Sequence, residues 1–218
     1  CVGHPLVDAV HTQLSKTAAR EKFLLDKDIR VIGLFPGSRR SEISVLLPVM
    51  LEAAERIEKR HFPIQIVIPQ APGIDESFLQ QYLAGSCLNV RVIKDDFYEV
   101  IQACDAIVAA SGTVTLEIAL LGVPHFITYK VSPWSYRILK RLVKIPYVGL
   151  CNIVTKQPVI KELLQDDVTP VRLEQQLMDL LTHPQRQQHA ENIRQQVKQA
   201  LGPSGGAENA AKLVLSLI

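Results

Sequence analysis

Between residues 29 and 129, short apolar runs alternate with longer segments in which apolar positions recur every three or four residues. The short runs are typical of strands buried on both faces, and the longer segments are typical of helices that pack on one side. The expected strands cover residues 29–35, 64–69, 89–93, 105–109 and 124–129, and the expected helices cover residues 41–59, 75–84, 97–103 and 113–121. This alternation predicts an α/β fold, a Rossmann-like parallel sheet with flanking helices.

The alternation fades after residue 129. A further helix is expected at 132–142, followed by a loop that contains residues 148–152. The remainder reads as helix, at 159–164, 171–181, 185–200 and 207–217. A break rich in glycine at 202–206 precedes the last of these segments, so we expect a helical C-terminal extension.

Composition limits the possible classes of protein. Of the 218 residues, 47% are hydrophobic and 21% are charged, a balance typical of a folded unit with a sizeable core. The formal net charge of +2 gives no indication of a nucleic-acid partner, and we expect none. The four cysteines form no CxxC pair and show no zinc-ligand spacing, which favours a reducing compartment over a secreted disulfide framework.

The apolar stretch at 106–129 is long enough to raise the question of a membrane span. Polar and turn-forming residues interrupt it at 111–113, at Glu117 and at 122–124, which favours strand, turn and helix over a span. The chain opens with Cys1 rather than methionine and without a signal peptide, so we expect a piece of a longer protein.

The first candidate binding loop follows the first expected strand and precedes the first expected helix. In an open parallel sheet, ligands bind beyond the carboxyl ends of the strands, where helix N-termini present unpaired N–H groups. Gly37 allows close approach of the backbone, Ser38 offers a hydroxyl, and the guanidinium of Arg39 can bond phosphate oxygens through two donors. The alternative is that Ser41 caps the helix and that the arginines of the loop are solvated.

The second candidate loop, residues 109–117, follows the fourth expected strand. Ser111 and Thr113 can present hydroxyl and amide donors to a diphosphate, and Gly112 lets a ligand approach the backbone. Glu117 lies one helical turn beyond Thr113, where its carboxylate could accept both hydroxyls of a ribose. The alternative is that Ser111 only caps the helix and that Glu117 only complements the helix dipole.

Established nucleotide and metal motifs are missing from the sequence. There is no GxGxxG after the first strand and no GxxxxGKS/T, which argues against a dehydrogenase and a P-loop kinase. HExxH is missing as well. We therefore expect neither a metal ion nor a cofactor, because arginine and helix ends can stabilise a departing nucleotide by themselves.

Eight segments, taken in order along the chain, resemble the lipid-A-disaccharide synthase family. They are VGHPLVD (2–8), LFPGSR (34–39), ASGT (110–113), LE (116–117), KRLVK (140–144), LCN (150–152), VIKELLQ (159–165) and GAENAA (206–211). Each segment alone is weakly specific, whereas the ordered set spans nearly the whole chain. Cys151 departs from the family pattern, which has proline before the asparagine.

The resemblance implies a GT-B glycosyltransferase, in which two Rossmann-like domains face each other across a cleft. This chain would supply the second half, with an N-terminal remnant and interdomain linker at 1–28, a nucleotide-sugar-binding domain at 29–201 and a C-terminal crossover helix at 202–218. The implied reaction transfers 2,3-diacylglucosamine from UDP to 2,3-diacylglucosamine 1-phosphate, which forms a β-1,6-linked disaccharide and releases UDP.

The resemblance also assigns roles to individual residues. Those implied to bind the UDP moiety are Gly37, Ser38, Arg39, Ser111, Gly112 and Thr113 at the diphosphate and Glu117 at the ribose. Asn152 is implied to lie near the donor sugar, so Asn152 and Arg39 are the candidate catalytic residues.

The general base and the acceptor-lipid pocket are implied to lie in the N-terminal domain of the family, so we expect this chain alone to be inactive. That domain and the two lipid substrates would be its partners. The protein would act in the cytoplasm, peripheral to the inner face of the inner membrane. Residues 129–144 mix aromatic and basic side chains, which fits either contact with an anionic membrane surface or an ordinary amphipathic helix. Two alternatives remain open, a UDP-sugar 2-epimerase-like enzyme and a non-catalytic nucleotide-binding module.

Overall fold

The computed structural model describes residues 3–131 and 146–215 of the chain. Six strands form one sheet in which all neighbouring strands run parallel. Their spatial order is β3-β2-β1-β4-β5-β6, with β1 Arg30–Phe35, β2 Ile64–Pro69, β3 Val90–Ile93, β4 Ala106–Ala110, β5 His125–Tyr129 and β6 Glu162–Leu164. The strand order reverses between β1 and β4, which is the switch point where doubly wound sheets bind their ligands.

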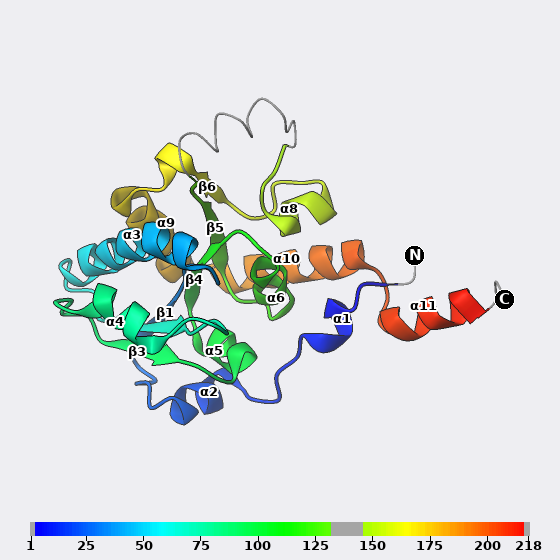
Figure 1. The fold of residues 1–218 in the computed structure, drawn as a ribbon, viewed down its shortest axis with the longest axis horizontal. Coiled ribbons are helices and arrows are strands. Elements are labelled where there is room, and N and C mark those ends of the chain that lie inside the picture. Colours follow the sequence, from blue (N-terminus) through cyan, green and yellow to red (C-terminus); the bar gives the residue numbers. More distant parts are fainter. Residues whose placement is uncertain (1–2, 132–145, 216–218) are drawn as a thin grey trace.

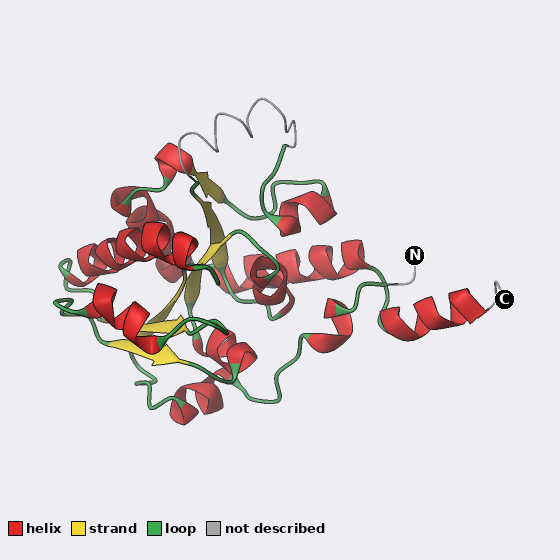
Figure 2. Ribbon diagram, in the orientation of Figure 1, coloured by secondary structure: helices red, strands yellow, loops and turns green. Residues whose placement is uncertain are grey.

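Helices cover both faces of this sheet (Figure 1 and Figure 2). They are α1 Leu6–Ala9, α2 Lys16–Lys22, α3 Arg40–Glu58, α4 Glu76–Leu83, α5 Phe97–Ala103, α6 Val114–Leu120, α8 Leu150–Thr155, α9 Pro170–Thr182, α10 Arg186–Leu201 and α11 Gly206–Leu215. None of the helices within 3–131 and 146–215 is long and apolar enough to cross a membrane.

Different helices pack on the two faces of the sheet. Successive strand residues point to opposite faces, and Ile32 and Leu34 of β1 join a buried core with α3, α4 and α9. Val31 and Phe35 point the other way, into a core with α2 and α5. On that second face, Ile127 of β5 packs with α6, α8 and α10. Both faces are therefore dry, which explains why the strands are readable as continuous apolar runs.

The five strands expected from the sequence are all present, and the expected parallel sheet is confirmed. The four helices expected between residues 41 and 121 correspond to α3, α4, α5 and α6. Beyond residue 170, the helices expected at 171–181, 185–200 and 207–217 correspond to α9, α10 and α11 over their described parts. The helix expected at 132–142 lies outside the described residues.

Two local predictions are wrong. Residues 159–164 do not form a helix, because Glu162–Leu164 is strand β6, which pairs with β5 in the register Ile127↔Glu162. Only Leu163 of its three residues is buried. An alternation of buried and partly buried positions over three residues is too short to be distinguished from helical spacing in the sequence. The region expected to be a loop around Asn152 is instead helix α8, which begins at Leu150.

The first and last described segments lie side by side (Figure 1). The carboxylate of Asp8 accepts hydrogen bonds from the backbone N–H groups of Gly205 (2.9 Å) and Gly206 (3.2 Å). These bonds join residues that are almost 200 positions apart, at the beginning of α11. Beyond this junction, Val214 and Leu215 are 58% and 72% exposed.

Candidate functional site

A cavity of about 750 Å³ lies at the carboxyl ends of β1, β2, β3 and β4. Its walls come from the loops that follow these strands and from the first turns of α3 and α6. Seven of the residues singled out from the sequence line it: Gly37, Ser38, Arg39, Ser111, Gly112, Thr113 and Glu117. The two candidate loops, which are more than 70 residues apart in sequence, thus meet at the switch point of the sheet.

The first loop is organised by Glu42, in the first turn of α3. Its Oε2 accepts the backbone N–H groups of Ser38 (3.2 Å) and Arg39 (3.4 Å), and its Oε1 lies 3.1 Å from Nη1 of Arg39. Gly37 has a φ of +108°, and a Cβ there would collide with the Glu42 carboxylate. Helix α3 begins at Arg40, with Arg39 as its N-cap, so the alternative in which Ser41 is the cap is wrong.

The two neighbouring arginines have different surroundings. The Arg39 side chain is 78% exposed and lines the cavity. Arg40 turns away, with Nη2 at 2.5 Å from Oδ2 of Asp75 and its guanidinium 4.6 Å from the ring centre of Phe78. Arg39 is therefore the arginine of this loop that a ligand in the cavity would meet.

The second loop leaves backbone donors unpaired. The Ser111 hydroxyl donates to the carbonyl of Val148 (3.0 Å), and the Ser111 N–H donates to Thr128 (2.9 Å), so both donors are engaged within the chain. The N–H groups of Gly112, Thr113 and Val114 donate to no residue within 3–131 or 146–215. A Cβ at Gly112 would meet open space. Unpaired amides at the start of a helix are a favourable environment for an anion.

Glu117 reaches the cavity from α6, and Tyr98 of α5 supports it from behind. The Tyr98 hydroxyl donates to Oε1 of Glu117 over 3.3 Å. Burial raises the pKa of the Glu117 carboxyl, although the bond from Tyr98 acts in the opposite direction. Burial, together with the charge of Glu117, raises the pKa of Tyr98. Oε2 of Glu117 has no partner in the described part of the chain, so it is available to a ligand hydroxyl.

Asn152 is 1% exposed and does not line this cavity. Its amide nitrogen donates to the carbonyl of Ile160 (2.8 Å) and to Oε1 of Glu162 (2.7 Å), while its oxygen accepts the Ile160 N–H (2.9 Å). Asn152 is therefore a buried residue of helix α8 and not part of the expected loop. Its role in catalysis stays a prediction, and this geometry favours action through neighbouring groups.

A family model for lipid-A-disaccharide synthetase matches residues 1–215. The chain belongs to the lipid-A-disaccharide synthetase family. A curated relative, lipid-A-disaccharide synthase of Geobacter sulfurreducens, is 43% identical over 217 residues, which cover 100% of this chain and 56% of the relative. The chain thus spans a little more than half the length of this member of the family.

Solved structures of other proteins share the fold of this chain. Anabaena HepE, crystallised with UDP-glucose, superposes with a TM-score of 0.62 at 14% identity, over 99% of this chain and 55% of the other. WaaG, a glycosyltransferase involved in lipopolysaccharide biosynthesis, gives a TM-score of 0.57 at 18% identity, over 93% and 51%. The α/β fold of this synthetase-family chain thus corresponds to about half of each of these structures, and its structural neighbours are GT-B glycosyltransferases, as expected.

The sequence did not single out Glu42 and Lys94, which line the cavity, or Tyr98, which bonds Glu117. Glu42 could have been found, because a carboxylate three residues after the N-cap is a helix-start signal. Lys94 follows β3 and lines the cavity, but a lone lysine after an edge strand carries no sequence signal. Tyr98 is revealed only by folding, since it bonds a residue 19 positions away.

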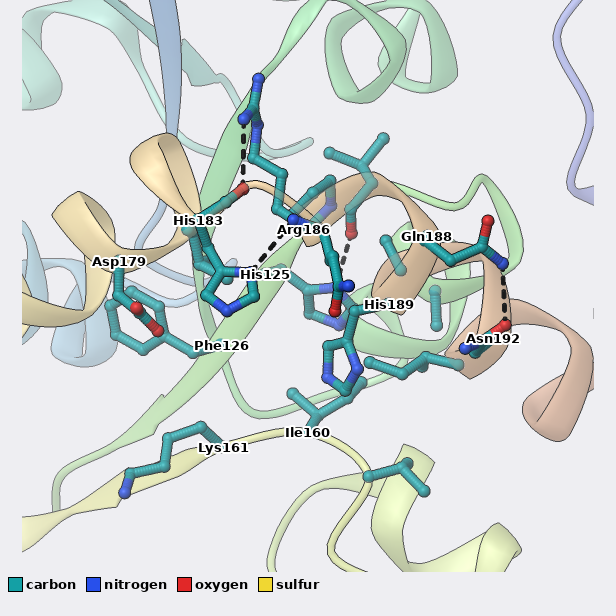
Figure 3. Close-up of a pocket in the computed structure, with 18 of the residues that line it drawn as sticks. His125, Phe126, Ile160, Lys161, Asp179, His183, Arg186, Gln188, His189 and Asn192 are labelled. Carbon is teal, nitrogen blue, oxygen red and sulfur yellow. Dashed lines mark hydrogen bonds between the residues drawn. The ribbon is translucent and has the colours of Figure 1, made fainter.

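A second cavity, of about 360 Å³, lies at the opposite, amino end of β5 between α9 and α10 (Figure 3). None of the predicted site residues lines it. Its floor includes His125, whose Nδ1 lies 2.9 Å from the carbonyl of Val123. Burial lowers the pKa of His125 to about 4, so the ring is neutral at pH 7. In the described part of the chain, no group of three or more His, Cys, Asp or Glu residues could hold a metal ion.

Proposed function

We propose that this chain is the donor-binding half of a glycosyltransferase that acts on UDP-2,3-diacylglucosamine. The transfer would join 2,3-diacylglucosamine to 2,3-diacylglucosamine 1-phosphate through a β-1,6 linkage and release UDP. The observation that carries the proposal is the single cavity at the switch point, where both predicted diphosphate loops and Glu117 come together in a chain of this family. Family membership favours transfer over the epimerase alternative.

The chemistry required of this half is the stabilisation of a leaving diphosphate. An acceptor hydroxyl oxygen forms a bond to the anomeric carbon, the bond from that carbon to the diphosphate oxygen breaks, and the hydroxyl proton passes to a base. The N–H groups of Gly112 and Thr113, which have no partner among the described residues, and the guanidinium of Arg39 would take up the charge that develops on the diphosphate. We expect this base to lie in the part of the full-length relatives that this chain does not cover.

Glu117 would bind the ribose. Its Oε2 would accept hydrogen bonds from the ribose hydroxyls. The bond from Tyr98 to Oε1 fixes the carboxylate before the nucleotide arrives. The proposal needs no metal ion, because cationic and amide donors already face the cavity. We further propose that the protein acts in the cytoplasm at the inner face of the inner membrane, where its lipid substrates would be available.

Binding of UDP to this chain tests the proposal. We expect calorimetric titration to give tighter binding for UDP than for ADP or NAD, because the dinucleotide fingerprint is missing while both diphosphate loops are present. NAD binding equal to or tighter than UDP binding would contradict the nucleotide-sugar assignment.

Activity measurements separate the remaining alternatives. The chain alone should show no disaccharide formation, whereas a protein with the full length of the relatives should form disaccharide and release UDP. UDP binding without transfer in the full-length protein would support the non-catalytic module, and epimerised donor sugar would support the epimerase.

A further inference from the structure

The carboxylate of Glu162, at the start of β6, accepts three hydrogen bonds. Its Oε2 accepts the backbone N–H of Val148 (3.0 Å). Its Oε1 accepts the backbone N–H of Gly149 (2.9 Å) and the side-chain amide of Asn152 (2.7 Å). The partly buried side chain of Glu162 therefore holds both the turn before α8 and the side-chain amide of Asn152 within α8.

The same turn is attached to the cavity from its other side. The carbonyl of Val148 accepts the hydroxyl of Ser111, the first residue after β4. Gly149 is wedged against the sheet, because a Cβ there would collide with the side chain of Ile127. Val148 thus connects Glu162 to Ser111. Its backbone N–H donates to Glu162, and its backbone carbonyl accepts the hydroxyl of Ser111.

We propose that Glu162 is a positioning residue for the diphosphate site, an inference that rests on the proposed function. Glu162 fixes Val148, Val148 fixes the Ser111 hydroxyl, and Ser111 in turn aims the unpaired amides of Gly112 and Thr113 into the cavity. Donors that are held in place before the ligand arrives bind a developing charge better than donors that must first be ordered. Under the competing explanation, Glu162 only caps α8 and contributes to stability alone.

Glu162→Gln is the informative variant because it keeps the size of the side chain. A glutamine offers one oxygen and one NH2 group, so in either orientation its NH2 faces a backbone N–H that needs an acceptor. Ser111→Ala breaks the same connection at its other end. Glu174→Gln is a matched control, since Glu174 is a buried carboxylate held by Arg56 and Arg60 (2.6 Å each) between α9 and α3, and it does not line the cavity.

The experiment is a double-mutant cycle read by UDP titration of this chain, with the backbone amide resonances of Gly112 and Thr113 followed by NMR. We expect Glu162→Gln and Ser111→Ala each to weaken UDP binding about fivefold, and the double variant to be no more than about tenfold weaker. Both single variants should shift the Gly112 and Thr113 resonances without ligand. The Glu174→Gln control should lower the unfolding temperature but leave UDP affinity and these resonances unchanged.

Two results would overturn the inference. One is additive behaviour, with the double variant about 25-fold weaker. The other is a Glu162→Gln protein that unfolds at a lower temperature while its UDP affinity and its Gly112 resonance match those of the wild type. If Glu162→Gln does not fold, Glu162→Asp, which keeps the charge but withdraws the carboxylate from Val148, carries the same comparison. A wild-type chain that binds no UDP would sink the proposed function, while the amide resonances would still decide whether Glu162 positions this loop.

Discussion

The two ends of the parallel sheet use carboxylates in opposite ways. At the amino end, the buried Asp105 meets Lys16 (2.7 Å), Arg20 (2.5 Å) and the backbone N–H of Val31 (2.9 Å). At the carboxyl end, Glu42 and Glu162 are held mainly by backbone amides. Lys16 and Arg20 at the amino end are thus committed to internal pairs, whereas the loops at the carboxyl end keep a largely exposed guanidinium, that of Arg39, and N–H groups that have no partner in the described part of the chain. The comparison suggests a division of labour to be tested, with stability supplied at the amino end and the proposed binding supplied at the carboxyl end.

The strongest test of this division is Asp105→Ala. Removing the carboxylate leaves the Arg20 guanidinium, which is 8% exposed, buried without its charged partner. Breaking one side of a buried pair typically costs about 3–5 kcal/mol, so we expect a loss of that order in the free energy of unfolding. Urea denaturation measures the loss, and UDP affinity of the folded variant should match the wild type. A loss below about 1 kcal/mol would remove Asp105 from this role.

A second test uses pH at the same end of the sheet. Burial lowers the pKa of His125 in the folded chain to about 4, below the usual unfolded value near 6.5. The unfolded state therefore binds more protons in this window, so stability falls as pH falls from about 6.5 towards 4. Between pH 7 and pH 4.5 we expect this residue to account for a loss of about 2 kcal/mol.

Urea denaturation at both pH values, for the wild type and for His125→Phe, isolates that contribution. The variant should lose less stability on acidification than the wild type, because it has no ring to protonate. Identical losses in the two proteins would show that the pKa of His125 is the same in the folded and the unfolded chain, so that its protonation does not destabilise the fold.

At the carboxyl end, Arg39→Ala should weaken UDP binding about tenfold, as expected for the loss of a charge-assisted bond to a diphosphate. Thermal stability should change little, since the side chain is 78% exposed. Arg40→Ala is the matched control, because Arg40 is engaged with Asp75 and Phe78 and should leave UDP affinity almost unchanged. A larger effect from Arg40 than from Arg39 would mean that the guanidinium is assigned to the wrong residue.

The sequence was sufficient to predict the sheet and the meeting of two loops at one cavity, because strands buried on both faces read as apolar runs and the loops at their carboxyl ends converge there. It was not sufficient for β6, whose three residues are recruited by pairing with β5. Asn152 was placed in a loop because the motif around it carries no helix signal, yet it is buried in α8. Glu162 could not be recognised, since its three partners come together only when the chain folds.

The contact between Asp8 and the beginning of α11 has a mechanical consequence. Because one carboxylate grips the amides of Gly205 and Gly206, a displacement of α11 pulls directly on residues 5–9, and the reverse also holds. Gly3 and Gly205 flank this contact with φ values of +90° and +81°, a backbone conformation that glycine adopts at little cost. The segments at 5–9 and 205–206 therefore form one shared pivot, about which they would move together rather than slide independently.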